Sequence, residues 1–93
     1  MPYLYILKCN DGSFYTGSTQ NLRLRMAQHA CGKGATYTKE RLPVELVYYE
    51  EFERITDAYR REKQIQGWSH QKKEALIKGD EDRLIEFSKN HGL

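Results

Sequence analysis

The stretch YLYILKCNDGSFYTG, residues 3–17, decides the fold of this chain. Residues 3–8 carry aromatic and branched aliphatic side chains at both alternating sets of positions, which is typical of a strand buried on both faces. Residues 10–13 combine Asn, Asp, Gly and Ser, the usual turn formers, and the strand pattern resumes after them. The stretch therefore predicts a β-hairpin that carries Tyr5 on its first strand and Tyr15 on its second.

Four helices and a third strand are predicted after the hairpin. Asn21 is the best-placed N-cap for the first helix, Thr56 and Asp57 are expected to cap the second, and Gly67 to end it. The predicted elements are a helix over residues 22–30, a strand over 44–49, a helix from about 56 to 67, a helix over 69–79 and a helix from residue 80. This order predicts an α+β fold, a small three-stranded, mainly antiparallel sheet flanked by helices, with the first strand in its centre.

Length and composition exclude several classes of protein. The 93 residues suit one domain, residues 1–93. No apolar run approaches the roughly 18 residues of a membrane span, and no signal peptide precedes the first strand. Cys9 and Cys31 have neither zinc-site spacing nor the number expected of a disulfide framework, which favours two free, mostly buried thiols. We therefore expect a cytoplasmic protein without a membrane partner.

The charge is unevenly distributed along the chain. The net charge is +2, but residues 1–49 carry six basic and three acidic side chains, whereas residues 50–93 carry one more acidic than basic side chain. The positive half is the half that contains the hairpin tyrosines. This arrangement suits a polyanionic partner such as DNA or RNA.

The first predicted helix brings a cation and an imidazole to the hairpin. Leu22, Arg25, Met26 and His29 follow the spacing i, i+3, i+4, i+7 and so share one face. The two apolar residues should anchor this face to the sheet, which places Arg25 and His29 at its edge beside the tyrosines. The alternative is an ordinary solvent-exposed arginine and a boundary histidine.

The second predicted helix places a carboxylate among apolar residues. Ala58 and Ile65 mark the face turned to the sheet, and Glu62 lies between them. An isolated buried carboxylate costs several kcal/mol unless it is paired, protonated or bound to a metal. Glu62 is therefore either the partner of Arg25 or Arg61 in an ion pair, or a ligand for Mg²⁺ whose other ligands are waters and substrate oxygens.

The segment between the first helix and the third strand is predicted to be a flexible basic loop. It combines glycines with hydroxyl groups and cations, the side chains that contact nucleic-acid backbones. The candidate nucleic-acid-binding residues are Lys33, Thr36, Tyr37, Thr38, Lys39 and Arg41. A solvated loop without a ligand is the alternative.

The order of the hairpin tyrosines, Arg25, His29 and Glu62 along the chain resembles that of the GIY-YIG nuclease superfamily. Tyr3-Leu4-Tyr5 stands at the first motif and Tyr15-Thr16-Gly17 at the second, with Tyr3 in place of the leading Gly and Thr16 in place of the Ile. Arg25 and His29 follow at the family's helical spacing. Residues 58–68 resemble the helix of the family's metal site, with Glu62 in the glutamate position. The motif core covers residues 3–68, and residues 69–93 form a helical C-terminal part. The segment Tyr37-Thr38…Arg41-Leu42-Pro43 is similar to that of the small stand-alone bacterial members of the YhbQ/YazA type.

The resemblance implies a divalent-metal-dependent endonuclease that hydrolyses DNA phosphodiester bonds, with a role in DNA repair or recombination. Glu62 would hold a single Mg²⁺ or Mn²⁺, and Arg25 would neutralise charge on the scissile phosphate. Tyr5 or Tyr15 would deprotonate or orient the attacking water, and His29 would position a group or relay a proton.

Two questions remain open at this level. The alternative to an enzyme is a non-catalytic nucleic-acid-binding module that uses the same basic cleft to hold DNA or RNA without cutting it. No separate DNA-binding module is attached, so a protein partner could supply specificity to a monomer or weak dimer. The inward carboxylate of Glu62 favours the enzyme, because it would repel a phosphate unless a cation intervenes.

Overall fold

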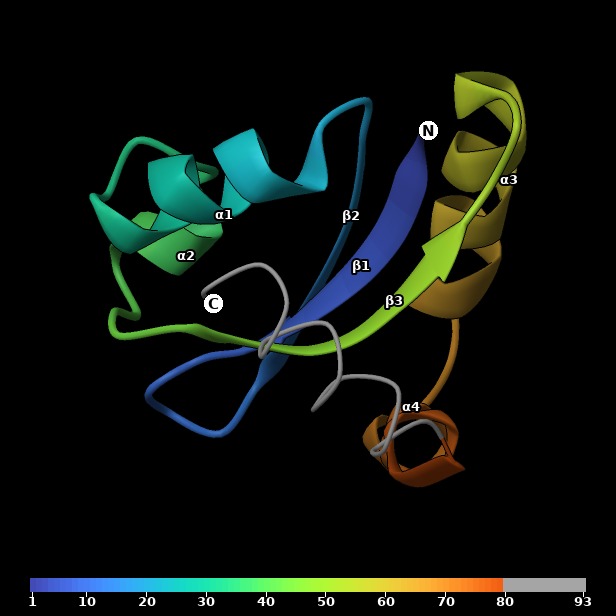
Figure 1. Ribbon diagram of the computed structural model, residues 1–93. Helices are drawn as coiled ribbons and strands as arrows, with labels where there is room; N and C mark the ends of the chain where they lie inside the picture. Colours follow the sequence, from blue (N-terminus) through green and yellow to red (C-terminus); the bar gives the residue numbers. More distant parts are fainter. Residues whose placement is uncertain (80–93) are drawn as a thin grey trace.

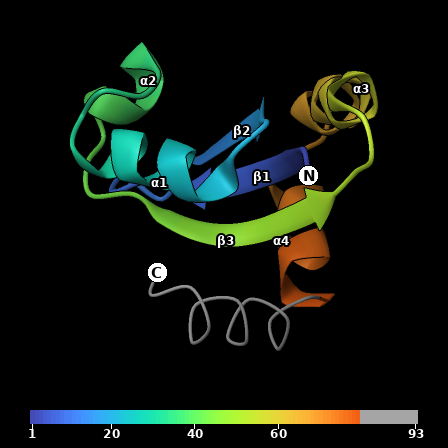
Figure 2. The ribbon, with the colours of Figure 1, turned by 45° about the horizontal axis from the view of Figure 1, so that its top comes forward.

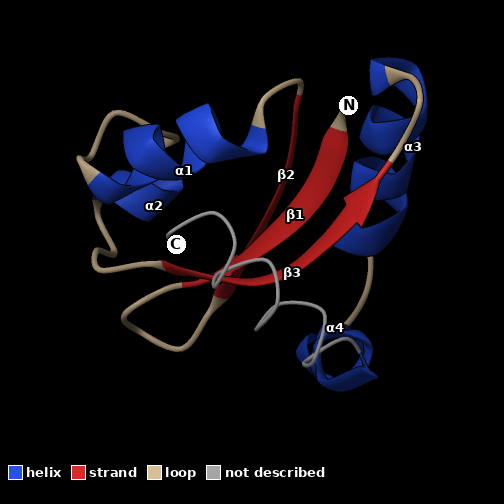
Figure 3. Ribbon diagram, viewed as in Figure 1, coloured by secondary structure: helices blue, strands red, loops and turns tan. Residues whose placement is uncertain are grey.

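The predicted hairpin is formed by β1 (Tyr3–Lys8) and β2 (Phe14–Thr19) in the computed structural model, which describes residues 1–79 (Figure 1). A third strand, β3 (Glu45–Glu51), pairs with the other edge of β1, and both pairings are antiparallel. The strand order is thus β2-β1-β3, with β1 in the centre as predicted. The α+β class and the three-stranded antiparallel sheet are confirmed (Figure 3).

The hairpin register determines which side chains share a face of the sheet. Tyr5 lies opposite Gly17, and Leu7 lies opposite Tyr15. Since side chains alternate along a strand, Tyr5, Leu7 and Tyr15 point to one face of the sheet. Leu4 and Ile6 point to the other face. The hairpin therefore presents both phenols on the same face, close to a glycine.

Helix α1 (Leu22–Ala30) covers the face that carries the tyrosines. Asn21 caps it as predicted, because its Oδ1 accepts a hydrogen bond of 3.0 Å from the backbone N–H of Leu24. Leu22 and Met26 are buried against Tyr5 in one hydrophobic cluster. The predicted apolar anchors of this helix are therefore confirmed.

Helices α3 (Ile55–Gln66) and α4 (His70–Gly79) cover the other face. Ala58 and Ile65 of α3 are completely buried, and Ile65 packs on Leu4 in a second hydrophobic cluster. Figure 2 shows α4 on the opposite side of the sheet from α1. The Oγ of Ser69 caps α4 by accepting a hydrogen bond of 3.2 Å from the N–H of Lys72.

Several local predictions differ from the structure. A short helix, α2 (Thr36–Lys39), lies in the segment predicted as loop. Helix α3 begins at Ile55, so Thr56 and Asp57 lie inside its first turn instead of capping it. Of the two thiols predicted to be mostly buried, Cys9 is buried, whereas Cys31, the C-cap residue of α1, is exposed. The third strand runs two residues further than predicted, and the helix predicted from residue 80 lies outside the described residues.

Within residues 1–79, no helix is both long enough and apolar enough to cross a membrane.

Candidate active site

The five predicted catalytic residues come together although they lie on four different elements. The ring centroids of Tyr5 and Tyr15 are 6.4 Å apart, and each lies 5.6 Å from that of His29. The positive charge of Arg25 acts on the pKa of all three rings, and the carboxylate of Glu62 acts on the pKa of both tyrosines. Because such electrostatic effects need short distances, these residues form one site.

Tyr5 is the buried centre of this site. Its hydroxyl lies 2.8 Å from Nε2 of His29, and its side chain is completely buried. Burial raises the pKa of Tyr5 well above its ordinary value, and the neighbouring Tyr15 raises it further. The positive charge of the nearby Arg25 side chain acts in the opposite direction. Tyr5 is therefore neutral at pH 7 and has a cation beside it that would favour its phenolate.

Gly17 makes room for the Tyr5 phenol. A Cβ atom at this position would lie 2.5 Å from the Tyr5 oxygen and 2.6 Å from the ring carbon that bears it. Real Cβ atoms do not approach other atoms so closely. A side chain at the glycine of the Tyr15-Thr16-Gly17 motif is thus excluded sterically, because the Tyr5 phenol approaches closely from the neighbouring strand.

His29 is buried, whereas the sequence predicts it at the edge of the helix face. Only 1% of its surface is exposed, because the segment after α1 folds back over it. Its Nδ1 lies 2.9 Å from Oγ1 of Thr38, and a Cβ on Gly34 would overlap its ring. Burial, and then the charge of Arg25, lower the pKa of His29 to about 4, so the imidazole is neutral at pH 7.

Tyr15 is half-buried and therefore the more accessible of the two phenols. Burial raises its pKa, and among charged groups the carboxylate of Glu62 raises it most. Its ring also stacks on that of Tyr37, with centroids 6.1 Å apart and an angle of 26° between the planes. Tyr15 thus lies between the buried Tyr5 and the open side of the site.

Glu62 is held by two neutral donors. Ser18 donates a hydrogen bond of 2.7 Å from its Oγ to Oε1, and Gln66 donates one of 2.7 Å from its Nε2 to Oε2. The Nζ of Lys63 lies 3.9 Å from Oε2, at the outer limit of an ion pair. The Glu62 side chain is 12% exposed. The carboxylate is therefore oriented by protein groups and still reachable from outside.

One alternative predicted from the sequence, an ion pair between Glu62 and Arg61, is wrong. The guanidinium of Arg61 points to Glu50 instead, with its Nε 3.0 Å from Oε1 of that residue. Its pKa is raised by this hydrogen bond. Arg61 thus belongs to a separate pair between α3 and β3, and it does not neutralise Glu62.

The residues present fit a single divalent cation. Within residues 1–79 there is no cluster of three or more His, Cys, Asp or Glu side chains, so a site built entirely from protein ligands is absent there. Mg²⁺ is typically held by only one or two carboxylates and takes its other oxygens from water and substrate phosphates. Glu62, already oriented by Ser18 and partly exposed, suits this mode of binding.

A groove of about 390 Å³ adjoins the site. It extends from Ser18, the partner of Glu62, to Arg25 and Gln28 on α1, and Ile55 at the start of α3 lines it as well. Arg25 lines this groove directly, and Ser18 links it to Glu62, so the groove offers space for a substrate beside the guanidinium.

The predicted nucleic-acid-binding residues differ in accessibility. Lys33, Thr36, Tyr37 and Lys39 are exposed. Thr38 is completely buried on the inner side of α2, so it is not on the surface where a nucleic-acid backbone would pass. The exposed residues of this set remain candidates for DNA binding.

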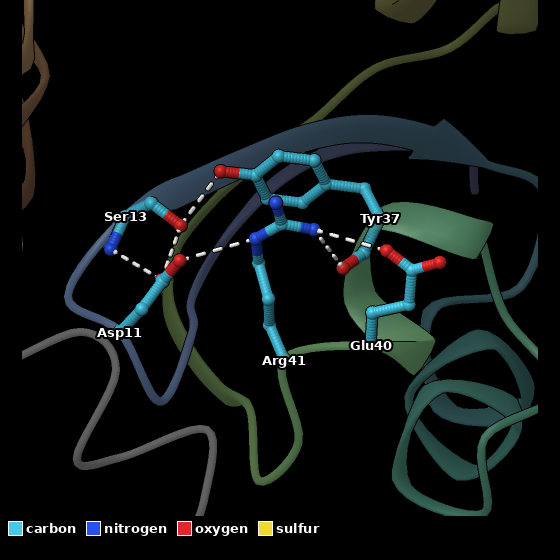
Figure 4. Close-up of polar contacts among 5 residues, drawn as sticks. All are labelled: Asp11, Ser13, Tyr37, Glu40 and Arg41. Atoms are coloured by element: carbon cyan, nitrogen blue, oxygen red, sulfur yellow. Dashed lines mark hydrogen bonds and ion pairs between the residues drawn. The ribbon is translucent and has the colours of Figure 1, made fainter.

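Arg41 belongs to a polar network that ties the hairpin turn to α2 (Figure 4). Its Nε donates a hydrogen bond of 3.1 Å to Asp11, its Nη1 donates one of 3.0 Å to the backbone oxygen of Tyr37, and its guanidinium lies over the Tyr37 ring. The Tyr37 hydroxyl in turn donates a hydrogen bond of 2.7 Å to Ser13. Much of the charge of Arg41 is thus already engaged within the protein, and the network keeps Tyr37 against Tyr15.

The comparison with family models decides the family. Residues 1–75 match the model of the GIY-YIG catalytic domain. The chain belongs to the GIY-YIG family. GIY-YIG domains are associated with endonucleases, which agrees with the convergence of tyrosines, arginine and carboxylate described above.

Small bacterial proteins are among the relatives of this GIY-YIG domain. It is 52% identical over 75 residues to a UPF0213 protein of Staphylococcus haemolyticus, covering 81% of this chain and 92% of the relative. A UPF0213 protein of Staphylococcus aureus is 47% identical over 76 residues, with 82% and 93% covered. The expected similarity to small members of the superfamily is confirmed.

Two solved structures are similar to the GIY-YIG domain described here. The solution NMR structure of a UPF0213 protein from Bacillus halodurans has 43% sequence identity and a TM-score of 0.57, and the match covers 87% of each chain. A second solution NMR structure, of a protein from E. faecalis, has 37% identity and a TM-score of 0.55 over 83% of this chain and 82% of that one.

Sequence reasoning missed two residues of the candidate site, Ser18 and Gln66, and gave a third, Thr38, a different role. Gln66 follows Glu62 by four positions on one helix, a spacing that places side chains side by side and could have indicated the hydrogen bond. Ser18 has no local signal, because its partner Glu62 lies on a helix distant in the sequence. The burial of Thr38 beside His29 has no local signal, because it depends on how the segment after α1 folds back.

Proposed function

We propose that this protein is a divalent-metal-dependent endonuclease that hydrolyses phosphodiester bonds in DNA. The observation that carries the proposal is the position of Glu62, a partly exposed carboxylate whose charge acts on both tyrosines of a site that also contains Arg25. A cleft that only bound phosphate would be weakened by this negative charge. A cleft that holds a cation needs it.

Arg25 is placed to bind the scissile phosphate. It is half-buried, lines the groove and lies beside Tyr5. A guanidinium held in place before the reaction stabilises the negative charge that builds on the phosphate oxygens in the transition state. Mg²⁺ or Mn²⁺ held by Glu62 would supply Lewis-acid stabilisation of the same charge.

The tyrosines and His29 handle the proton of the attacking water. Tyr15 is the more accessible phenol, and Glu62 is the charged group that raises its pKa most. Tyr15 is therefore the phenol that orients the water. Tyr5 lies behind it, with the neutral imidazole of His29 at 2.8 Å. As the water attacks phosphorus, its proton would pass to the Tyr5 oxygen while the Tyr5 proton passes to Nε2 of His29, which becomes an imidazolium. The P–O bond to the leaving oxygen breaks as the new P–O bond forms, and the leaving oxygen takes up a proton from solvent.

The direct test is cleavage of labelled single-stranded, duplex, nicked and branched DNA at low salt. We expect cutting with Mg²⁺ or Mn²⁺ and none with excess chelator. A preference for nicked or branched DNA would indicate a role in repair or recombination. Binding of DNA without cutting in either metal would contradict the proposal and favour a nucleic-acid-binding module.

The two tyrosines are expected to differ in importance. Tyr5→Phe removes the hydroxyl of the proton relay and should lower the cleavage rate about 10²-fold or more. Tyr15→Phe removes one hydrogen bond to the water, worth about 1 to 1.5 kcal/mol, and should lower the rate about tenfold. Single-turnover cleavage rates measure both, and Tyr59→Phe on the exposed side of α3 is the matched control. A larger loss for Tyr15→Phe than for Tyr5→Phe would reverse the two roles.

A further inference from the structure

Thr38 forms two hydrogen-bond contacts in the interior. Its Oγ1 lies 2.9 Å from the backbone oxygen of Ala35 and 2.9 Å from Nδ1 of His29. A carbonyl oxygen can only accept, so the single hydroxyl proton of Thr38 is directed to Ala35. The lone pair of Oγ1 then faces His29, and Nδ1 of the imidazole must carry the proton that completes this bond.

The other ring nitrogen of His29 faces Tyr5. A neutral imidazole carries one ring proton, so with that proton on Nδ1 its Nε2 has a lone pair. The Tyr5 hydroxyl, 2.8 Å from Nε2, then donates to it. The backbone oxygen of Ala35, which can only accept, thus fixes the direction of each hydrogen bond from Thr38 to Tyr5.

We propose that Thr38 is a positioning residue that holds His29 in the tautomer with the proton on Nδ1, so that Nε2 is free to accept the proton of Tyr5. The catalytic consequence rests on the proposed function, whereas the tautomer itself does not. With the proton on Nε2 instead, the imidazole would donate to Tyr5 and could not take up its proton.

The surroundings of Thr38 are built to keep it in place. Gly34 lacks the Cβ that would overlap the His29 ring, which lets the backbone approach the imidazole. On the outer side of α2, Arg41 and Tyr37 tie this short helix to the hairpin turn (Figure 4). The segment predicted to bind nucleic acid therefore has a second role. It forms the pocket that encloses the buried His29 side chain.

The test compares Thr38→Val, which keeps the shape but loses the hydroxyl, with Thr38→Ser, which keeps the hydroxyl. Nitrogen-15 NMR of the histidine rings at pH 7 distinguishes a protonated from an unprotonated ring nitrogen. His29→Gln identifies the signals that belong to His29. Thr56→Val, an exposed substitution on α3, is the control for the change from Thr to Val.

The native protein, Thr38→Ser and Thr56→Val should show His29 protonated on Nδ1 alone. Thr38→Val should show a mixture of tautomers or the form protonated on Nε2. The proposal is overturned if the native chain carries the proton on Nε2, or if Thr38→Val leaves the Nδ1 form unchanged. Amide spectra with native dispersion show that each variant is folded, and Thr38→Ala replaces Thr38→Val if the valine variant is not.

Cleavage assays then test the catalytic consequence. Thr38→Val should lower the single-turnover rate about tenfold or more with unchanged DNA affinity, and Thr38→Ser should restore it. An equal loss in both variants would contradict positioning through the hydroxyl. If the native protein does not cleave DNA at all, the proposed function fails, and the NMR result still decides whether Thr38 sets the tautomer.

Discussion

Replacing Glu62 by glutamine should abolish metal-dependent cleavage of DNA while leaving the domain folded. Glutamine has nearly the same shape, and its amide oxygen can still accept the hydrogen bond from Ser18. It loses the negative charge that would hold Mg²⁺. Because a metal contributes several kcal/mol to the stabilisation of transition-state charge, the rate should fall about 10³-fold or more.

Two measurements separate loss of the metal from loss of the fold. Titration of the native protein with Mg²⁺ should shift NMR signals around Glu62, and the Glu62→Gln variant should not show these shifts. Thermal unfolding should change little. Glu53→Gln replaces an exposed carboxylate just before α3; it is the matched control and should cleave normally. Cleavage by Glu62→Gln at the native rate would remove this residue from the reaction.

Replacing Gly17 by alanine should destabilise the domain and disable the site together. The added methyl group would lie 2.5 Å from the Tyr5 oxygen, so the phenol or the β1–β2 pairing must shift. Overpacking of this kind costs about 1 to 3 kcal/mol, and loss of the buried bond between Tyr5 and His29 adds about 1 kcal/mol. The expected loss is a large part of the stability of so small a domain.

Denaturant unfolding of Gly17→Ala measures this cost. Gly67→Ala is a suitable control, because a Cβ at position 67 would lie 3.5 Å from the backbone oxygen of Gln64, an ordinary contact. It should change the free energy of unfolding by less than about 1 kcal/mol. A Gly17→Ala variant as stable as Gly67→Ala would show that the phenol of Tyr5 does not need its present position.

The parts of the fold predicted from the sequence are those with a strong local signal. The hairpin combines a two-sided apolar strand with a glycine turn, and α1 combines an Asn21 cap with apolar residues at helical spacing. The same spacing on α3 placed Glu62 between two buried residues, which the structure confirms for Ala58 and Ile65. Local pattern and final structure agree in these elements because short-range and long-range contacts favour the same conformation.

The parts that the sequence did not predict depend on contacts between distant segments. Helix α2 has no apolar periodicity of its own and is held by Thr38 inside and by Arg41 outside. His29 is buried because the segment after α1 folds back over it. The partner of Arg61 could not be read from α3 alone, because Glu50 lies on β3. Geometry of this kind emerges only when the whole sheet is assembled.

The long separation between Ser18 and Glu62 has a consequence for the newly made chain. The hairpin and Arg25 leave the ribosome before α3 does, so an incomplete chain can carry the groups proposed to bind phosphate but lacks the carboxylate. The site is completed only when α3 packs on β2 and β1. The proposed activity therefore depends on the packing of α3, and a local opening that detaches α3 would remove the carboxylate from the site while the hairpin stays paired.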